Sequence, residues 1–479
     1  MRRAVLFVVV LAGCAVGPDF RRPAAPPVDR YTPEPLTTQS VSAETPGGDL
    51  QRFLSEMDIP AQWWTLFRSE ALNSLVEQSL KANPGLQSAQ AALRVADETY
   101  RAQRGAFFPA VQASFSPTRQ KVAPVLSSPL NSNASIFSLH TAQLSVAYAP
   151  DVFGGVRRQV ENAAAMAEAQ RFQLEATYVT LTANVVAAAV QEAALRAQVA
   201  ATEEIVTLVT EQVQLMQRQL QLGAIAEANV IQQRVVLAQA QASLAPLRKQ
   251  LAQQRNLLTA LAGGFPSEEV AQKFDFSALA LPVELPVSLP SKLVQQRPDV
   301  RAAEAQLHAA SAQIGVATAN MLPQFTINAD VGSVATAMSS LFTSGSGFWA
   351  VAANVTQPVF QGGALLHRRR AAEAAYDQAA AQYRSTVIGA LQNVADTLRA
   401  LEYDAIALKA ALDAKLLAQE SLAIARRQLQ LGDISYFALL TAEQAYFQTV
   451  LTLVQAQANR YADTAALFQA LGGGWWNRP

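Results

Sequence analysis

The sequence predicts an α+β fold in which very long helical hairpins alternate with paired β-strands. Three observations predict it: a tandem duplication, long stretches without helix breakers, and short segments in which apolar and polar residues alternate. The charge is balanced, with 37 basic and 37 acidic residues, so no electrostatic argument favours a nucleic-acid partner. Charged residues make up only 15% of the chain, below the roughly 25% that is typical of soluble domains.

The duplication covers most of the chain. The hexapeptide RQLQLG occupies Arg218–Gly223 and recurs 209 residues later at Arg427–Gly432. Pro-Asp-Val-Phe-Gly-Gly at 150–155 is followed 208 residues later by Pro-Val-Phe-Gln-Gly-Gly at 358–363. This period is far longer than that of a solenoid repeat. The sequence therefore contains two copies of one large structural unit.

Each copy is predicted to contain a helix of about 22 residues, an extended hairpin, a very long helix, a glycine turn and a helix of about 38 residues. The first helices are expected at Pro84 to Gly105 and Pro298 to Met321. The long helices have strong support, because 156–222 contains neither glycine nor proline and 364–431 contains only Gly389. At 1.5 Å per residue such a helix spans about 100 Å, which indicates a coiled-coil-like assembly.

Four segments alternate between apolar and polar residues, as β-strands with two different faces do. They lie around Val111–Phe115, Leu144–Tyr148, Phe325–Val331 and Val351–Val355. Pro117, Pro124, Pro129 and the Ser/Asn-rich stretch 127–135 mark the first hairpin loop, and 344–347 marks the second. The pattern fits a half-buried soluble sheet, or a barrel in lipid with a polar interior.

The N-terminus has the pattern of a cleaved secretion signal. Arg2 and Arg3 precede an apolar stretch that ends in Leu-Ala-Gly before Cys14, the only cysteine of the chain. The stretch is too short to span a bilayer. Leu-Ala-Gly-Cys resembles a bacterial lipoprotein box, so we expect cleavage before Cys14 and a lipid on its sulfur. Ala15 in the next position favours the outer membrane, and no later run of 18 apolar residues predicts a transmembrane helix.

A membrane location constrains how the strands assemble. Every backbone group in a bilayer must be paired, so a sheet there must close. Four strands cannot enclose a lumen, and bacterial barrels have eight or more strands. Two, three or four chains would supply 8, 12 or 16 strands, and a conducting pore needs at least three chains because an eight-stranded barrel is filled by side chains.

Motifs along the whole mature chain resemble the TolC-like outer-membrane factor family, in its NodT-type lipoprotein branch. The resemblance rests on residues 14–20 (CAVGPDF) with Arg22-Pro23, on Trp63-Trp64 through Phe67, on Leu72-Asn73, Leu75 and Asn83-Pro84, on residues 297–300 (RPDV) with 302–304 (AAE), on 358–360 (PVF) with Gly362-Gly363, and on 470–475 (ALGGGW).

The resemblance implies a fold and a function. Three chains would form a homotrimer with a 12-stranded β-barrel in the outer membrane and a long α-helical barrel in the periplasm. The trimer would be the passive exit duct of a tripartite efflux pump, without enzymatic activity or cofactors. Its partners would be a periplasmic adaptor (membrane fusion) protein and an inner-membrane pump of the resistance-nodulation-division class. Two alternatives stay open: a duct for protein or oligosaccharide export, and a structural periplasmic lipoprotein.

The predicted organisation follows from the repeat and the resemblance. The segments are a signal peptide (1–13), a lipid-anchored and equatorial segment (14–69), the first repeat (70–264), an equatorial linker (265–297), the second repeat (298–474) and a C-terminal tail (475–479).

Candidate sites lie at both ends of the long helices. The turns at Gly223-Ala224 and Gly432-Asp433 would form the periplasmic tip, where the resemblance places a gate and the adaptor contact. Thr441 stands where many family members have an aspartate that rings the closed aperture. Glu443 is close in sequence but faces about 200° away on a helix. Phe437, one turn before Thr441, could form an apolar constriction instead, or could simply pack between helices.

The strand-to-helix corners carry glycines and arginines. Gly154-Gly155 and Gly362-Gly363 would permit a tight bend. The arginines that follow, Arg157-Arg158 and Arg368–Arg370, are expected to be a solvated helix face, with anionic lipid headgroups as the alternative.

Motifs of catalysis and metal binding are missing from the sequence. His140, His308 and His367 are isolated and lack the spacing of metal ligands. The chain has no nucleophile elbow and no phosphate-binding loop. We expect neither a catalytic site nor a bound metal.

Overall fold

The computed structural model describes residues 15–55, 57–123, 125–126, 130 and 132–478. Cys14, the signal peptide and five residues of the predicted first loop (124, 127–129 and 131) lie outside the described residues. The chain divides into two compact units. The first unit comprises the chain up to Arg22, Leu93–Ala169 and Ala303–Tyr383, and the second comprises Pro23–Ala92, Gln170–Ala302 and Arg384–Pro479.

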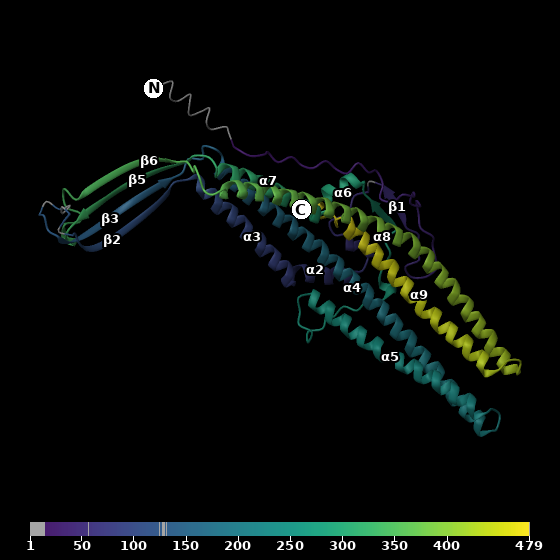
Figure 1. Ribbon diagram of the computed structural model, residues 1–479. Helices are drawn as coiled ribbons and strands as arrows, with labels where there is room; N and C mark the ends of the chain where they lie inside the picture. The colour runs from purple at the N-terminus through teal and green to yellow at the C-terminus, as the bar shows by residue number, and fades with distance from the viewer. Residues whose placement is uncertain (1–14, 56, 124, 127–129, 131, 479) are drawn as a thin grey trace. The chain divides into compact units, whose positions relative to one another are not determined.

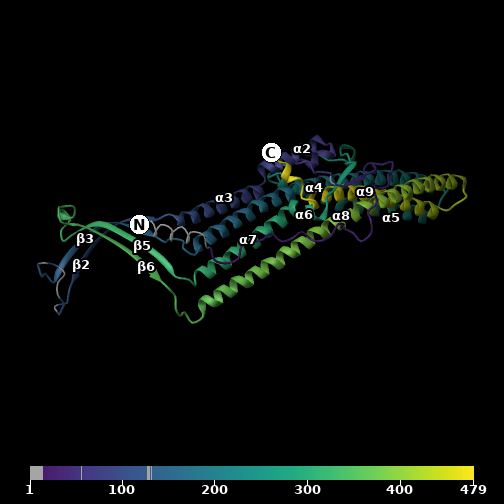
Figure 2. The same cartoon turned by 90° about the horizontal axis from the view of Figure 1, so that it is seen from above.

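The first unit contains an antiparallel sheet with strand order β2-β3-β5-β6 (Figures 1 and 2). Its strands are β2 (Ala110–Lys121), β3 (Ile136–Tyr148), β5 (Gln324–Ala335) and β6 (Gly347–Thr356). The four predicted strands are therefore confirmed. The two copies meet at the β3–β5 pair, where Leu144 lies opposite Val331 and the Ser145 hydroxyl donates to Asp330 at 2.6 Å.

The sheet has open edges and open faces within one chain. The outer strands β2 and β6 have no second partner strand in the described part of the chain. Every residue of β2 is exposed, and so are nine of the ten residues of β6. Unpaired strand edges and exposed apolar side chains are unfavourable in an isolated sheet.

One loop prediction is wrong. Pro117 was expected in the first hairpin loop, but it lies inside β2 opposite His140. Proline is tolerated there because β2 is an edge strand, so one side of its backbone has no partner strand in this chain.

Six helices carry the repeat. The long helices are α4 (Gly155–Gln221) and α8 (Ala364–Leu431), with 67 and 68 residues. The shorter ones are α3 (Pro84–Arg104), α7 (Pro298–Ala319), α5 (Glu227–Leu261) and α9 (Tyr436–Ala470). The predicted long helices are confirmed, and the last helix of each copy, α5 or α9, has 35 residues rather than about 38. Since α4 and α8, and likewise α5 and α9, begin 209 positions apart, we call residues at this offset matched.

The long helix α4 contains an apolar stretch. Among the described residues it is the one helix with a stretch long and apolar enough to cross a membrane. Of that stretch, 72% is buried inside the fold, so it is weak evidence for a membrane span.

The second unit adds elements outside the repeat helices. Strand β1 (Arg52–Ser55) pairs in parallel with β4 (Glu284–Val287). The unit also contains η1 (Trp63–Phe67), α2 (Glu70–Ala82) and α6 (Pro290–Gln296). Trp63 is fully buried and its ring stacks on Phe468 of α9, at 5.2 Å between ring centroids. The remaining short helices are η2 (Gly105–Phe107), η3 (Phe276–Ala278), η4 (Met338–Ser340) and η5 (Trp475–Asn477).

In each copy the end of the 35-residue helix meets the start of the 21- or 22-residue helix. The Asn83 amide donates to the Leu261 carbonyl at the end of α5 (3.0 Å), and its oxygen accepts from two amides in the first turn of α3. In the second copy Arg297 donates to the Ala470 carbonyl at the end of α9 (2.8 Å). Gly263 leaves α5 with a φ of +81°, and a Cβ there would lie 2.5 Å from the Ala82 carbonyl oxygen.

Candidate functional site at the two ends of the long helices

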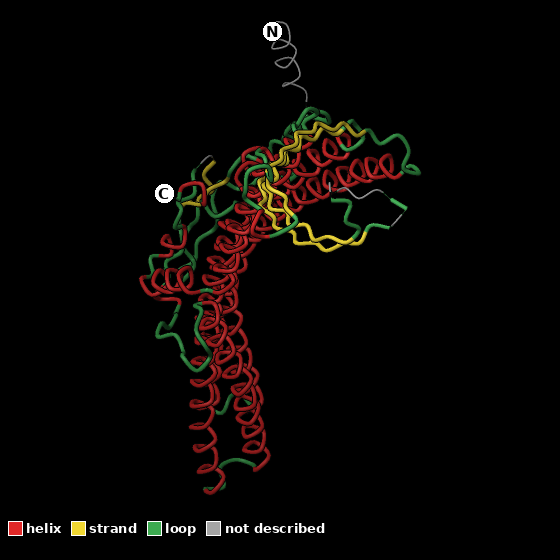
Figure 3. Tube along the Cα trace, turned by 90° about the vertical axis from the view of Figure 1, so that its left-hand side faces the viewer, coloured by secondary structure: helices red, strands yellow, loops and turns green. Residues whose placement is uncertain are grey.

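The two tip turns have the same backbone geometry. After α4 the amides of Gly223 and Ala224 donate to the carbonyls of Leu220 and Gln219, at 2.9 and 2.8 Å. After α8 the amides of Gly432 and Asp433 bond to the matched carbonyls, at 3.1 and 2.9 Å. Gly223 and Gly432 have φ angles of +71° and +82°, as the glycine of a Schellman cap requires. Figure 3 shows the turns as loops that close pairs of helices.

Side chains from α4, α5 and α9 meet near these turns. A buried cluster contains Ile205 and Val209 of α4, Val236 of α5 and Leu440 of α9. The Tyr436 hydroxyl, at the start of α9, donates to Gln219 of α4 at 2.6 Å. The first helical hairpin (α4 and α5) therefore contacts the second (α8 and α9) through both apolar and polar side chains.

The predicted gate residues lie on the exposed side of α9. Phe437 is 69% exposed in the single chain, so it is not packed between helices of its own chain. Thr441 is also exposed, and its hydroxyl donates to the Phe437 carbonyl at 3.0 Å. Phe437 and Thr441 thus lie one turn apart on one exposed face.

Glu443 lies on the opposite, buried side of α9, as its position in the helix predicted. It is only 1% exposed; Gln233 of α5 donates to its carboxylate at 3.4 Å, and Arg426 of α8 lies 3.8 Å away. Gln212 of α4 also hydrogen-bonds it. Burial raises the pKa of Glu443, and the hydrogen bonds from Gln233 and Gln212 and the charge of Arg426 oppose that rise. Sequence reasoning did not identify this carboxylate as the polar centre of the tip.

The strand-to-helix corners differ between the copies. Gly154 has a φ of +77° directly before α4, and Gly362 and Gly363 have φ angles of +58° and +81° directly before α8. At the first corner the Asp151 carboxylate accepts from the amides of Val156 and Arg157, both at 2.9 Å. Asp151 thereby caps the first turn of α4.

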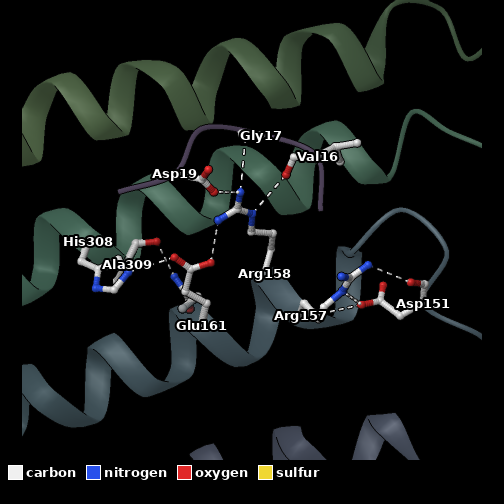
Figure 4. A network of polar contacts seen from close by, with 10 residues as sticks. Val16, Gly17, Asp19, Asp151, Arg157, Arg158, Glu161, His308 and Ala309 are labelled. Atoms are coloured by element: carbon white, nitrogen blue, oxygen red, sulfur yellow. Dashed lines mark hydrogen bonds and ion pairs between the residues drawn. The ribbon is translucent and has the colours of Figure 1, made fainter. Parts of the chain in front are cut away.

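The first corner also binds the N-terminal segment, as Figure 4 shows. The Arg158 side chain is only 5% exposed. It donates to the Val16 carbonyl at 3.1 Å and pairs with Asp19 at 2.8 Å and Glu161 at 2.7 Å. The expectation of a solvated face is wrong for Arg158, because Val16 and Asp19, in a segment 139 to 142 residues away, cover its side chain. Arg368–Arg370 are exposed, which fits both a solvated face and contact with lipid headgroups.

The isolated histidines have structural neighbours. His308 stacks on Phe20 with 4.4 Å between ring centroids and lies 2.9 Å from the Glu161 carboxylate. Gly315 allows the N-terminal segment to pack closely on α7, since a Cβ there would lie 2.9 Å from the Val16 carbonyl oxygen. Among the described residues, no group of three or more His, Cys, Asp or Glu side chains could hold a metal ion.

Solved structures with the same fold identify the class of protein. The outer-membrane channel OprN superposes with a TM-score of 0.85 at 27% identity, over 96% of this chain and all of that one. The outer-membrane protein VceC from Vibrio cholerae superposes with a TM-score of 0.81 at 27% identity, over 87% of this chain and all of that one. The paired long helices and the four-stranded sheet are those of a TolC-like outer-membrane channel.

The sequence comparisons then give the family. The family described as "Outer membrane efflux protein" matches residues 75–264 and 289–473, and this chain belongs to it. The probable efflux pump outer membrane protein TtgC of Pseudomonas putida is 30% identical over 98% of this chain and 94% of its own length. OprJ of Pseudomonas aeruginosa is 26% identical over 98% and 95%. The protein is an outer-membrane efflux channel that extends into the periplasm, in a family of channels rather than enzymes.

Proposed function

We propose that three copies of this chain form a homotrimer whose twelve strands close into one barrel. The observation that carries the proposal is the four-stranded sheet, with two edges that lack a partner strand in the described chain and with exposed apolar side chains. In a bilayer such a sheet must close. Three copies are the fewest that leave room for a conducting lumen.

The proposed trimer conducts cargo passively. A periplasmic adaptor protein and an inner-membrane pump of the resistance-nodulation-division class would deliver drugs or other amphiphiles to it. Support comes from the names of relatives in Pseudomonas putida, which include an antibiotic efflux pump protein and a toluene efflux pump protein. Export of protein or oligosaccharide is the alternative that the experiment below separates.

We also propose that Cys14 carries a lipid, and that the segment after it is anchored to the strand-to-helix corner. Ala15 packs so closely on Gly154 that a Cβ on Gly154 would lie 2.5 Å from the Ala15 Cα. The Val16 amide donates to the Phe153 carbonyl at 3.0 Å. The described segment that begins at Ala15 is therefore held against this corner.

At the periplasmic end, Phe437 and Thr441 are proposed to line the aperture. The turns at Gly223-Ala224 and Gly432-Asp433 are proposed to receive the adaptor. Both turns are exposed, and the acidic ring common in the family is absent at Thr441. An apolar constriction at Phe437 would exclude ions by its dry surface rather than by charge.

The division of the chain proposed above, with repeats over 70–264 and 298–474, gives each copy one hairpin at each end. The two copies would then alternate around the trimer axis, so that six similar units form one wall.

A deletion strain tests the efflux proposal. The strain should become sensitive to several unrelated amphiphilic drugs, and the wild-type gene should restore resistance. A Cys14→Ser copy shows whether the lipid is required, and a Phe437→Ala copy should raise ion conductance of the purified trimer in planar bilayers. The duct proposal is wrong if the deletion has no drug phenotype and wild-type trimers do not conduct. Normal conductance without a drug phenotype would instead favour another cargo.

A further inference from the structure

The four-stranded sheet of the first unit has one apolar and one polar face. Side chains alternate between the faces along each strand, and the register places like side chains of neighbouring strands side by side. The apolar face carries exposed side chains from all four strands: Val111, Phe115, Leu144, Ile327, Val331, Trp349, Val351 and Val355. The polar face carries Gln112, Ser114, Gln143, Ser145, Thr326, Asn328, Asp330 and Asn354. In a barrel that spans a membrane, the polar face lines the lumen.

Asp330 is the only charged residue on the polar face of the four strands. The strands contain two further charged residues, Arg119 and Lys121. Both alternate with the polar residues of β2, so they lie on the apolar face, near the end of that strand. The sequence has no other aspartate or glutamate between 105 and 150 or between 322 and 363. The charge of the polar face therefore comes from one carboxylate in each chain.

Hydrogen bonds from β3 orient this carboxylate. The Ser145 hydroxyl lies directly opposite and donates to Asp330 Oδ1 at 2.6 Å, and the Gln143 amide donates to the Ser145 oxygen at 3.2 Å. On its other side Asp330 lies opposite Ala350 of β6, which has no polar side-chain group. A hydroxyl donor orients a carboxylate but brings no positive charge. Asp330 therefore has no cationic partner on the polar face of the four strands.

We propose that Asp330 determines the charge selectivity of the channel. Three chains related by a threefold axis would place three Asp330 carboxylates at one level of the lumen. This inference rests on the proposed homotrimer and adds a substrate class to it. Charges of one sign around an aqueous pore raise the local concentration of counter-ions. The barrel therefore favours cations, including positively charged amphiphiles, over anions.

The proposed aperture in the second unit does not supply the same charge from Thr441 or Glu443. Thr441 is uncharged. Glu443 is 1% exposed, and Gln233 and Gln212 hydrogen-bond its carboxylate inside the chain. We therefore place the charge selectivity in the strands rather than at these two positions.

A purely structural role for Asp330 is the alternative. Its carboxylate would then serve only to bind Ser145 across the β3–β5 pair, where the two copies of the repeat meet. This role predicts weaker strand pairing in variants of Asp330, but no change in the preference for cations. Ion selectivity therefore separates the two roles.

Reversal potentials of purified trimers in planar bilayers test the proposal. In a KCl gradient at low salt the wild type should prefer potassium, and Asp330→Asn should lower the ratio of potassium to chloride permeability about threefold, towards one. Asp330→Lys should favour chloride, and Asp330→Glu should keep the preference of the wild type. The difference should be large at about 10 mM salt, where the screening length is about 30 Å, and small at about 1 M, where it is about 3 Å.

A relocated carboxylate separates the charge from the hydrogen bond. Ala350 lies opposite Asp330 on the same face, so Asp330→Asn with Ala350→Asp moves the charge to β6. That strand lies about 10 Å from β3, beyond the reach of the Ser145 hydroxyl. The double variant should regain the cation preference of the wild type. A double variant as unselective as Asp330→Asn would show that charge at this level of the barrel is not sufficient.

Chemical modification of assembled trimers covers the case in which the charge variants fail to fold. Asp330→Cys carries no fixed charge, and water-soluble thiosulfonate reagents can attach a negative or a positive group to it after the trimer has formed. The negative group should produce a cation preference, and the positive group an anion preference. Val331→Cys is the matched control, because its side chain lies on the apolar face and the same reagents should leave its selectivity unchanged. Unsubstituted trimers control for Cys14.

The outcomes separate this inference from the proposed function. If trimers conduct, but Asp330→Asn and the modified Asp330→Cys channel keep the wild-type permeability ratio, the selectivity proposal is wrong and the duct proposal stands. Wild-type trimers that conduct without a cation preference at low salt would also overturn the selectivity proposal alone. If wild-type trimers do not form or do not conduct, the duct proposal itself is wrong.

Discussion

The two copies of the repeat bury clusters of charged residues at different positions along their matched helices. In the first copy Glu192 is fully buried and pairs with Arg196 at 2.6 Å and with Arg255 at 2.7 Å. The matched residues of the second copy are Leu401, Ala405 and Thr464, all at most 2% exposed. A position that holds an ion cluster in one copy therefore holds small or apolar side chains in the other.

The second copy has its own cluster one helical turn away. Asp404 of α8 hydrogen-bonds Asp463 of α9, and Arg460 is fully buried beside them. The matched residues of the first copy are Leu195, Leu251 and Gln254. Burial lowers the pKa of Arg460 to about 10, and the charge of Asp404 opposes that fall.

The arginines of the two clusters hold different segments outside the repeat. Arg255 donates to the carbonyls of Val270 and Gln272 in the linker after α5, at 2.7 and 3.2 Å. Arg460 donates to Ser40 of the N-terminal segment at 2.6 Å. The comparison teaches that the repeat provides the scaffold, while one buried arginine in each copy selects which non-repeated segment packs there.

Arg255→Ala is expected to lower the free energy of unfolding more than any of the substitutions that follow. This change removes one of the two cations beside the fully buried Glu192 carboxylate, so we expect a loss of about 3 kcal/mol in the free energy of unfolding. Denaturant unfolding of the detergent-solubilised protein, followed by helical circular dichroism, measures it.

A triple variant with the residues of the second copy tests whether the unpaired buried charge causes this loss. Glu192→Leu, Arg196→Ala and Arg255→Thr together reproduce the residues of the second copy and leave no buried charge at this site. The triple variant should stay within about 1 kcal/mol of wild type, yet its linker should be cleaved faster by protease because Val270 and Gln272 lose their donor. If Arg255→Ala loses no more unfolding free energy than the triple variant does, the buried Glu192 charge does not destabilise the single variant.

The sequence predicts the elements of this fold better than its contacts. Long helices, tip glycines and alternating strands are visible because each depends on residues close in sequence. The β1–β4 pair and the binding of Val16 and Asp19 by Arg158 join segments far apart, so no local pattern indicates them. Helical periodicity correctly predicted that Thr441 and Glu443 lie on different faces of α9. That Glu443 is buried against Gln233 depends on how the two hairpins pack, which periodicity cannot specify.

An intermediate effect on stability is expected from the carboxyl pair of the second copy, Asp404 and Asp463. Burial and the hydrogen bond to Asp463 raise the pKa of Asp404 from 3.8 to about 7. The folded state therefore holds a proton that the unfolded state releases, and stability is lost as the pH rises from about 4 to about 7. Asp404→Asn keeps the site neutral at every pH. Because the group is only partly buried, the variant should be more stable than wild type by about 1–2 kcal/mol at pH 8, and equal to it at pH 4.

Denaturant midpoints between pH 4 and 8 measure this difference. Asp463→Asn should also reduce the pH dependence, because it removes the charged neighbour that helps to raise the pKa of Asp404. Leu195→Ile in the first copy is the matched control and should shift stability equally at all pH values. Parallel pH profiles for Asp404→Asn and wild type would contradict the assignment.

The smallest effect is expected at the helix junctions, where the copies use different side chains for one task. Asn83 caps α3 with its oxygen and binds the end of α5 with its amide, whereas Arg297 binds the end of α9 and pairs with Asp299 at 2.6 Å. Asn83→Asp keeps the cap but turns a carboxylate oxygen toward the Leu261 carbonyl. We expect a local loss of about 1 kcal/mol, which corresponds to amide exchange about fivefold faster in the last turn of α5. Exchange at the end of α9 should not change, because Arg297 holds that junction separately. Faster exchange at both ends would mean that the junctions open together, and that the copies are not independent at this level.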